Sequence, residues 1–386
     1  MNFSFSCIRF RSRHWNRWSK QVWFYLIAPL LFVSQHVYAQ SPIDTKATRK
    51  TRALLSNLHH FAGDRLLIGH QDDLAYGVNW ERETGRSDVK EVCGDYPAVF
   101  GWDVSKLGQR PVNIDSVNFM DMQQWIIDVF KMGGINTISW HMDNFATGGD
   151  SWDTTSCLPQ ILAGGSKHSA YVKKLDQFAD FVRGLRAGAF NRPIPIIFRP
   201  FHEHTGSWFW WGEGHRSAEQ YISIWRFTVA YLRDTKKLHN ILYAYSPDIF
   251  PDKKTYLSCY PGDEYVDILG VDDYHDVSSH GDPKELTRRL RMLVELAEEK
   301  GKVAALTETG RERIPYAEWW TQTLLKHIQA DPVATKIAWV LLWRNDSFLH
   351  HYVPFDGHSS SRDFQRFYAD PTTWFVEDLP NMYRKR

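Results

Sequence analysis

Eight short apolar runs, separated by segments of helical periodicity, constrain the fold of this 386-residue chain most strongly. The runs cover residues 66–69, 98–102, 135–140, 194–198, 241–245, 266–271, 303–306 and 337–343. Between most of them, apolar side chains recur on one helical face, as at Leu286, Leu290 and Leu293. Continuous apolar strands that alternate with one-faced helices favour a parallel sheet covered by helices. Eight such repeats predict an α/β protein built as a single (β/α)8 TIM barrel.

An open doubly wound sheet is the alternative arrangement of the same elements. It is weakened because no glycine-rich phosphate-binding loop follows any of the strands. Polar residues also follow the end of every predicted strand. They include His70, Asp103, His141, Glu203, Asp248, Asp272, Glu308 and Asn345. In a barrel these residues converge at the mouth formed by the carboxyl ends of the strands, where barrel enzymes place their sites.

The first 39 residues have the organisation of a signal peptide. An arginine-rich region precedes an apolar run over 22–33, and Ala39 supplies a small residue at the expected cleavage point. We therefore predict a signal peptide at 1–39, a catalytic domain at 40–386 and a periplasmic or secreted protein. An uncleaved membrane anchor is the alternative, although the apolar run is short for a membrane span. No membrane span is predicted after signal cleavage.

Charge and cysteine content limit the possible partners. Lys and Arg number 46 against 45 Asp and Glu, a net charge of +1, so no nucleic-acid or anionic-surface partner is predicted. Removal of residues 1–39 leaves Cys93, Cys157 and Cys259. This odd number allows at most one internal disulfide in an oxidising compartment. The cysteine spacings match no zinc-binding pattern.

The segment 194–212, IPIIFRPFHEHTGSWFWWG, joins an apolar strand to an ionisable cluster and a run of aromatic residues. A carboxylic acid can protonate a glycosidic oxygen, and aromatic rings can hold a sugar, so this combination indicates carbohydrate chemistry. The alternative is a core strand that runs into a loop of packing aromatics. Hydrolysis needs a second carboxylate, and we expect Glu203 and Glu308 to form the pair. Across a barrel mouth they can approach to about 5–5.5 Å, the spacing of a retaining double displacement.

The sequence His202-Glu203-His204 also raises the possibility of a metal site. If the strand continues through these residues, alternate side chains point to opposite sides and no three-ligand set forms. We therefore predict neither a metal nor a cofactor.

Three motifs carry a resemblance to a known family. They are RPFHEHTGSWFWWG at 199–212, LTETG at 306–310 and WRN at 343–345. Together they resemble glycoside hydrolase family 26, whose members are mostly β-mannanases. The resemblance implies a barrel with Glu203 as acid/base on the fourth strand and Glu308 as nucleophile on the seventh.

The same resemblance implies roles for neighbouring residues. His202 precedes the acid and would position it or contact the sugar, and Tyr274 would hydrogen-bond the nucleophile. Trp343 would be a sugar platform, Arg199 would orient the catalytic groups, and the remaining cleft-lining positions match His141, Trp208 and Arg344. We also expect the pKa of Glu203 to be raised by its surroundings, because the acid must stay protonated until attack.

The activity implied is retaining hydrolysis of β-1,4-mannosidic linkages in mannan, glucomannan or galactomannan. The expected partner is a β-mannan polysaccharide or a manno-oligosaccharide, and we also expect the protein to be a monomer. Two alternatives remain open. One is the same machinery acting on another β-glycan, such as a xylan or a mixed-linkage glucan. The other is a barrel that binds glycan without cleaving it.

Overall fold

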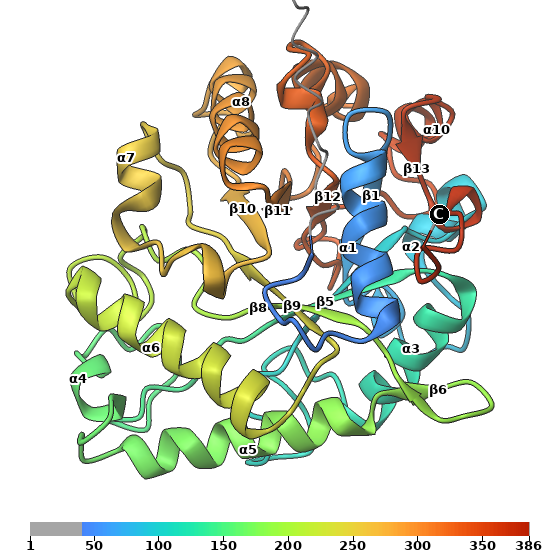
Figure 1. The fold of residues 1–386 in the computed structure, drawn as a ribbon. Helices are drawn as coiled ribbons and strands as arrows, with labels where there is room; N and C mark the ends of the chain where they lie inside the picture. Colours follow the sequence, from blue (N-terminus) through green and yellow to red (C-terminus); the bar gives the residue numbers. More distant parts are fainter. Residues whose placement is uncertain (1–40, 386) are drawn as a thin grey trace, which may run out of the picture. The chain divides into compact units, whose positions relative to one another are not determined.

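The computed structural model describes residues 41–385, so the predicted signal peptide at 1–39 lies outside the described residues. Eight parallel strands form a closed barrel (Figure 1). In order around the barrel they are β1 (Leu66–Gln71), β4 (Val99–Asp103), β5 (Ile135–Ser139), β8 (Ile196–Arg199), β9 (Ile241–Tyr245), β10 (Ile268–Asp273), β11 (Val303–Thr309) and β12 (Trp339–Leu342). Pairing of β12 with β1, from Leu67 opposite Trp339 to His70 opposite Leu342, closes the ring. The predicted (β/α)8 barrel is confirmed, and each of the eight apolar runs overlaps one of its strands.

Helices surround the barrel and connect its strands. They are α1 (Arg49–Phe61), α2 (Asp88–Cys93), α3 (Phe119–Met132), α4 (Leu158–Ile161), α5 (His168–Gly184), α6 (Ala218–Ala230), α7 (Lys253–Tyr256), α8 (Pro283–Lys300), α9 (Lys326–Ile328) and α10 (Ser361–Tyr368). The predicted helical segment over 114–132 begins only at Phe119. The reason is local, because the Asn118 side chain accepts hydrogen bonds from the N–H groups of Met120 and Asp121 and caps the helix there.

Short strands complete the structure outside the barrel. β2 (Tyr76–Gly77) and β3 (Trp80–Glu81) form one hairpin, and β6 (Arg186–Ala187) and β7 (Arg192–Pro193) form another. β13 (Thr373–Trp374) pairs with the start of β1. These additions lengthen the loops without interrupting the barrel.

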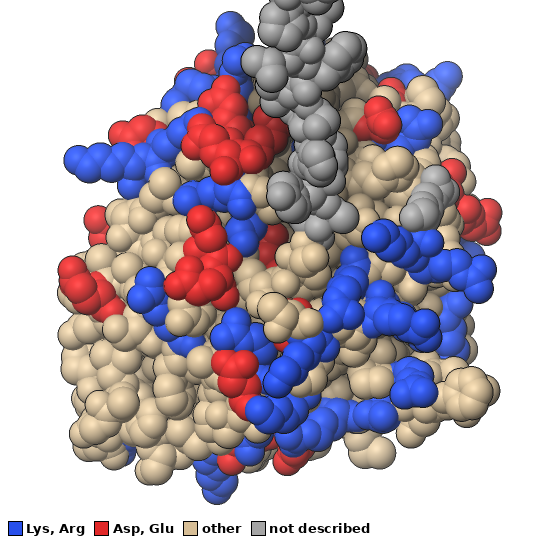
Figure 2. Space-filling model, in the orientation of Figure 1, with Lys and Arg blue, Asp and Glu red and all other residues tan. Residues whose placement is uncertain are grey.

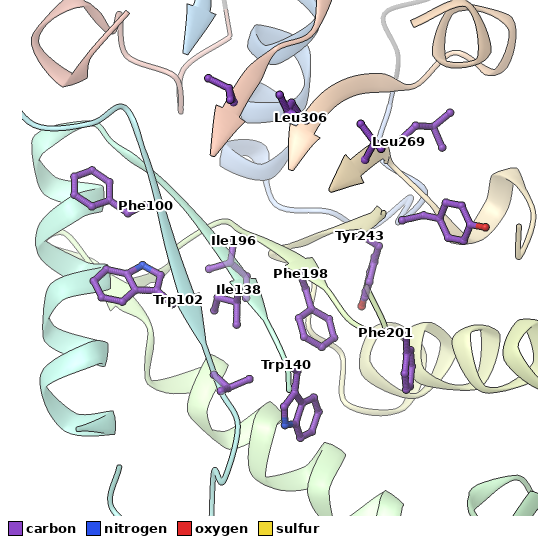
Figure 3. Packing of buried hydrophobic residues seen from close by; sticks show 14 of the residues in the cluster. Phe100, Trp102, Ile138, Trp140, Ile196, Phe198, Phe201, Tyr243, Leu269 and Leu306 are labelled. Atoms are coloured by element: carbon purple, nitrogen blue, oxygen red, sulfur yellow. The ribbon is translucent and has the colours of Figure 1, made fainter. Parts of the chain in front are cut away.

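Two apolar layers hold the strands in place. Inside the barrel, residues such as Ile135, Ile197 and Val303 pack against Leu54 and Leu58 of α1. Because several of these positions begin their strands, α1 closes the amino-terminal end of the barrel. Outside the barrel, a second layer packs between the strands and the helices, and Figure 3 shows part of it around Phe100, Trp102, Trp140 and Phe198. The carboxyl end of the barrel is therefore the end left available for a site.

In the part of the chain that the structure describes, no helix combines the length and apolar character needed to cross a membrane. Cys93, Cys157 and Cys259 are all free thiols. The disulfide that the sequence allows is not formed.

Candidate active site

A pocket of about 440 Å³ lies at the carboxyl end of the barrel. It contains Glu203 and Glu308 together with five of the predicted binding residues. These five are His141, His202, Trp208, Tyr274 and Trp343. The side chains come from β11 and from the segments after β5, β8, β10 and β12, so residues far apart in sequence converge as the barrel requires.

The chain turns sharply after β8, and this turn sets the position of Glu203. Residues 200–206 form turns, with φ of 52° at Phe201 and 53° at Glu203. Side chains other than glycine rarely adopt this left-handed region, and such strain persists only where the surroundings enforce it. Here the Glu203 N–H donates to the carbonyl of Ser246 at 2.8 Å, and the Glu203 carbonyl accepts from the Gly206 N–H at 2.9 Å.

The expectation that this segment continues as an extended strand is therefore wrong, since β8 ends at Arg199. His202 and His204 nevertheless point to different places. His202 lines the pocket, whereas the Nε2 of His204 lies 2.9 Å from the hydroxyl of Tyr245 in the aromatic shell behind it. His204 is thus a structural residue, and it lies too deep in that shell to act on a ligand in the pocket.

The Glu203 carboxyl group is held by Trp208, whose indole Nε1 donates to its Oε2 at 2.7 Å. Gly206 makes this contact possible, because a Cβ at residue 206 would lie 2.2 Å from the Trp208 ring. Burial raises the pKa of Glu203 well above its ordinary value, and the charges of Glu308 and Asp272 raise it further. This is the environment of a carboxyl group that stays protonated and can donate a proton.

Glu308 has a different environment on β11, where it is 3% exposed. The register of β11 shifts on both sides near this residue, at Val271–Asp272 of β10 and between Leu306 and Thr309. Such irregularities re-aim side chains at barrel rims. The redirected Glu308 carboxylate accepts hydrogen bonds from Arg199 and from the Tyr274 hydroxyl, the latter at 2.9 Å.

Arg199 links the two halves of the site from the end of β8. It is 1% exposed, and besides Glu308 it donates to Asp272 at 2.6 Å and to the Ser246 hydroxyl at 3.1 Å. A guanidinium with several donors in a fixed plane suits this bridging position. Both of its carboxylate contacts stabilise negative charge on the Glu308 side of the site.

The two glutamates are close together. One carboxylate oxygen of each lies within 4.8 Å of the other and of an Asp272 oxygen. This proximity matches the short carboxyl spacing of about 5–5.5 Å in retaining enzymes and not the wider spacing of inverting ones. Within residues 41–385, the same three carboxylates are the group that could hold a metal ion. Arg199 already supplies the positive charge between Asp272 and Glu308, so we assign no metal role to them.

His141 and His202 form a buried pair beside Glu203. Their Nε2 atoms are 3.3 Å apart, and the Nδ1 of His141 lies 2.9 Å from an oxygen of Asp103. Burial alone would lower the pKa of His141, but the charge and hydrogen bond of Asp103 outweigh it and raise the pKa. Burial and the charge of Arg199 lower the pKa of His202 well below its ordinary value.

These opposite shifts favour a proton on His141 over one on His202. The Nδ1 of His202 is buried and has no hydrogen-bond partner within the described structure.

Arg344 does not line this pocket, although Trp343 beside it does. Its guanidinium lies 3.0 Å from Asp115 and over the ring of Tyr76 at 5.8 Å. Burial lowers the pKa of Arg344, but the charges of Tyr76 and Asp115 outweigh burial, so the pKa is raised overall. Arg344 thus flanks the pocket on the side of the β1 and β4 loops.

The pocket also contains residues that the sequence did not single out. Trp152 is 48% exposed and stacks on His141 with ring centres 5.4 Å apart and an interplanar angle of 15°. Tyr352, Arg311 and Glu312 also line the pocket. All four lie in loops beyond the strand ends, and only the aromatic character of Trp152 and Tyr352 could have marked them as candidates.

A (β/α)8 barrel with two close carboxylates in an aromatic-lined pocket defines the class of barrel glycoside hydrolases. The model of glycosyl hydrolase family 26 matches residues 43–341, and the chain belongs to this family. A mannan endo-1,4-beta-mannosidase of Bifidobacterium adolescentis is 39% identical over 279 residues, which are 69% of this chain and 28% of that protein. The chain therefore spans less than a third of this curated relative.

Two solved structures are similar over most of the chain. The GH26 beta-mannanase BoMan26A of Bacteroides ovatus is 41% identical with a TM-score of 0.82, and the match covers 87% of this chain and 98% of that chain. A modular endo-beta-1,4-mannanase of Cellulomonas fimi is 40% identical with a TM-score of 0.83, covering 89% and 79% respectively.

Proposed function

We propose that this protein is a retaining glycoside hydrolase that cleaves β-1,4-mannosidic linkages in mannan, glucomannan or galactomannan. The observation that carries the proposal is the close pairing of Glu203 and Glu308 in contrasting environments. The substrate is supported by the mannanases to which the chain is similar.

In the first half of the reaction, Glu308 attacks the anomeric carbon while Glu203 protonates the departing glycosidic oxygen. The bond to the leaving sugar breaks as the bond to Glu308 forms, which gives a covalent glycosyl-enzyme. Burial and the charge of Glu308 hold the pKa of Tyr274 well above its ordinary value, so Tyr274 stays a hydroxyl donor to Glu308. Together with Arg199 it keeps the nucleophile oriented.

In the second half, Glu203 is ionised and acts as a base. It takes a proton from water, which attacks the anomeric carbon and releases Glu308 with overall retention of configuration. As Glu308 is neutralised in the covalent intermediate, the charge that raises the pKa of Glu203 falls away. This change favours the switch of Glu203 from acid to base.

Substrate binding follows from the groups around the two carboxylates. The rings of Trp208, Trp343 and Trp152 present faces against which sugars can stack. His202 lines the pocket beside Glu203 and contacts the sugar in the subsite where the bond is cut. Arg344, beside the pocket, contacts sugar further along the bound chain.

The experiment is a panel of soluble polysaccharides assayed for release of reducing ends. We expect turnover of linear mannan, glucomannan and galactomannan, and a loss of at least about a thousandfold in the Glu308→Gln variant. Xylan or mixed-linkage glucan as the preferred substrate would overturn the substrate assignment. Tight mannan binding without release of reducing ends by the unaltered protein would overturn the enzymatic assignment.

We further propose that the protein acts as a monomer in the periplasm or outside the cell after removal of residues 1–39. The support for export is the sequence of those residues, and amino-terminal sequencing of the mature protein tests it. A mature protein that begins at Gln40 is expected. Recovery of the intact amino terminus in the membrane fraction would favour the uncleaved anchor instead.

A further inference from the structure

A second large cavity lies at the other end of the barrel from the catalytic pocket. It is a groove of about 990 Å³ between the start of α1, the end of α3 and the carboxyl-terminal segment at 379–385. Because α3 ends at Met132 just before β5 begins, the groove is at the amino-terminal end of the strands. Figure 2 shows Lys and Arg side chains gathered over this part of the surface. We call it the basic groove.

Six cationic side chains line the basic groove, and no Asp or Glu does. They are Arg49, Lys50, Arg52, Lys131, Arg384 and Lys385. Only Lys131 has an acidic partner within residues 41–385, namely Asp128 at 2.8 Å. This concentration is unexpected in a chain whose net charge is only +1.

The arrangement is unfavourable for the isolated protein. Arg49, Lys50 and Arg52 occupy the first turn of α1, where the positive end of the helix dipole disfavours cations, and this turn has no acidic residue. Their mutual repulsion adds to that cost. α3, α6 and α8 carry Asp121, Glu219 and Glu285 in their first turns, whereas α5, like α1, has no acidic residue there. The missing negative charge points to an anionic ligand.

The shape of the site favours a linear ligand over a planar one. The cations lie along a concave groove, whereas a bilayer surface would meet cations on a flat or convex face. A bilayer would also be contacted by exposed apolar side chains, but none of the large exposed ones in the described chain lies in the groove. Its aromatic side chains, Phe130 and Tyr383, pack against each other in the groove wall with ring centres 4.5 Å apart and an interplanar angle of 52°.

We propose that the basic groove binds an acidic polysaccharide of the polyuronate class, with sugar carboxylates paired to the cations of α1 and the carboxyl-terminal segment. This inference rests on the proposed function, because attachment to an acidic polymer helps an enzyme of neutral mannan only where the two polymers occur together. Because the groove and the pocket are at opposite ends of the barrel, both can be occupied at once. Attachment then raises the effective concentration of mannan at the pocket.

The test is affinity electrophoresis of the mature protein in gels containing polygalacturonate, with neutral dextran as reference polymer. We expect polygalacturonate to retard the protein at low salt and the retardation to weaken as salt rises. The triple variant Arg49→Gln, Lys50→Gln, Arg52→Gln should weaken binding by about tenfold or more, since it removes half of the groove's cations. The double variant Arg384→Gln, Lys385→Gln should weaken binding from the other side of the groove.

A charge-matched control separates this site from general surface charge. The triple variant Lys284→Gln, Lys326→Gln, Arg362→Gln removes three exposed cations on α8, α9 and α10. It should bind polygalacturonate as the unaltered protein does, and all three variants should keep their activity on soluble mannan. That activity is a separate readout, so failure of the proposed hydrolysis is distinguishable from failure of the groove.

Three outcomes would overturn the proposal. The first is no retardation of the unaltered protein at low salt. The second is equal weakening in the groove and control variants. The third is binding to vesicles of anionic phospholipid without binding to polygalacturonate, which would assign the groove to a membrane surface.

Discussion

Trp208 donates its indole N–H to the Oε2 of Glu203 at 2.7 Å, so a ring that lines the pocket also controls the group expected to protonate the substrate. An indole N–H only donates, and it therefore favours the ionised carboxylate. Burial and the neighbouring carboxylates act in the opposite direction and prevail, since the pKa of Glu203 is raised overall. The hydrogen bond from Trp208 reduces the rise in the pKa of Glu203. A smaller rise suits a residue that must release and then regain a proton.

Replacement of Trp208 by Phe keeps a ring in the pocket but removes the donor. The pKa of Glu203 should rise further, because the hydrogen bond that lowers it is lost. The alkaline limb of kcat/KM reports ionisation of the acid, so it should move to higher pH. We also expect kcat to fall by about tenfold or more, since the carboxyl group is no longer held in place.

The measurement is kcat/KM for soluble galactomannan across the pH range. Trp152→Phe is the matched control, since Trp152 lines the same pocket and stacks on His141 without a hydrogen bond to either glutamate. It should leave the alkaline limb in place. An alkaline limb of Trp208→Phe at the same pH as in the unaltered protein, or at lower pH, would contradict the account.

Gly206→Ala should reproduce this behaviour without replacing any side chain that contacts the substrate. The added Cβ would lie 2.2 Å from the Trp208 ring, so the ring must move and the hydrogen bond to Glu203 must break. The same upward shift of the alkaline limb is expected. In the double variant Gly206→Ala, Trp208→Phe, the limb should move no further than in Trp208→Phe alone, because both changes remove one interaction. Additive shifts would show that Gly206 acts by another route.

Arg199→Ala should destabilise the protein strongly at neutral pH. Arg199 is the buried partner of Asp272 and Glu308, and loss of one partner of a buried ion pair costs about 3–5 kcal/mol. Denaturant unfolding measures this cost. Arg288→Ala is the control, since Arg288 pairs with Glu285 on the exposed face of α8 and should cost about 1 kcal/mol or less.

The loss in Arg199→Ala should depend on pH with a defined sign. Burial raises the pKa of Asp272 well above its ordinary value even though Arg199 lowers it, so removal of Arg199 raises it further. A carboxyl group with a raised folded pKa binds more protons in the folded than in the unfolded state, so its folded form loses stability as pH rises through that window. The deficit should therefore shrink as the pH is lowered from neutral. A deficit that grows on acidification would contradict this assignment.

Much of the fold follows from the sequence because its strands are buried on both faces. Runs such as 241–245 are continuously apolar, and β9 occupies those same residues. The polar residues at the ends of the predicted strands also placed Glu203 and Glu308 in one site, since the topology brings the carboxyl ends of parallel strands to one mouth of the barrel. Helix starts were less predictable, as Asn118 shows, because capping depends on a single side chain.

The detailed geometry of the site depends on departures from regular structure that a periodic pattern cannot reveal. The left-handed backbone of Glu203 invalidates any argument from strand alternation in that segment. The register shifts around Glu308 re-aim its carboxylate. Trp152 and Tyr352 enter the pocket from long loops, whose paths are set by tertiary packing. The basic groove was hidden for another reason, since an overall charge near zero conceals local segregation.

The most direct test of the account is to trap the covalent intermediate. A 2-deoxy-2-fluoro-mannosyl fluoride slows both steps through its ring fluorine, while its good leaving group allows the first step to proceed, so the glycosyl-enzyme accumulates. Mass spectrometry of the intact protein and of its peptides locates the attached sugar. The account predicts one sugar on the peptide that contains Glu308, and none in the Glu308→Gln variant. A stable label on Glu203 or on another residue, in an enzyme that is inactivated, would contradict it.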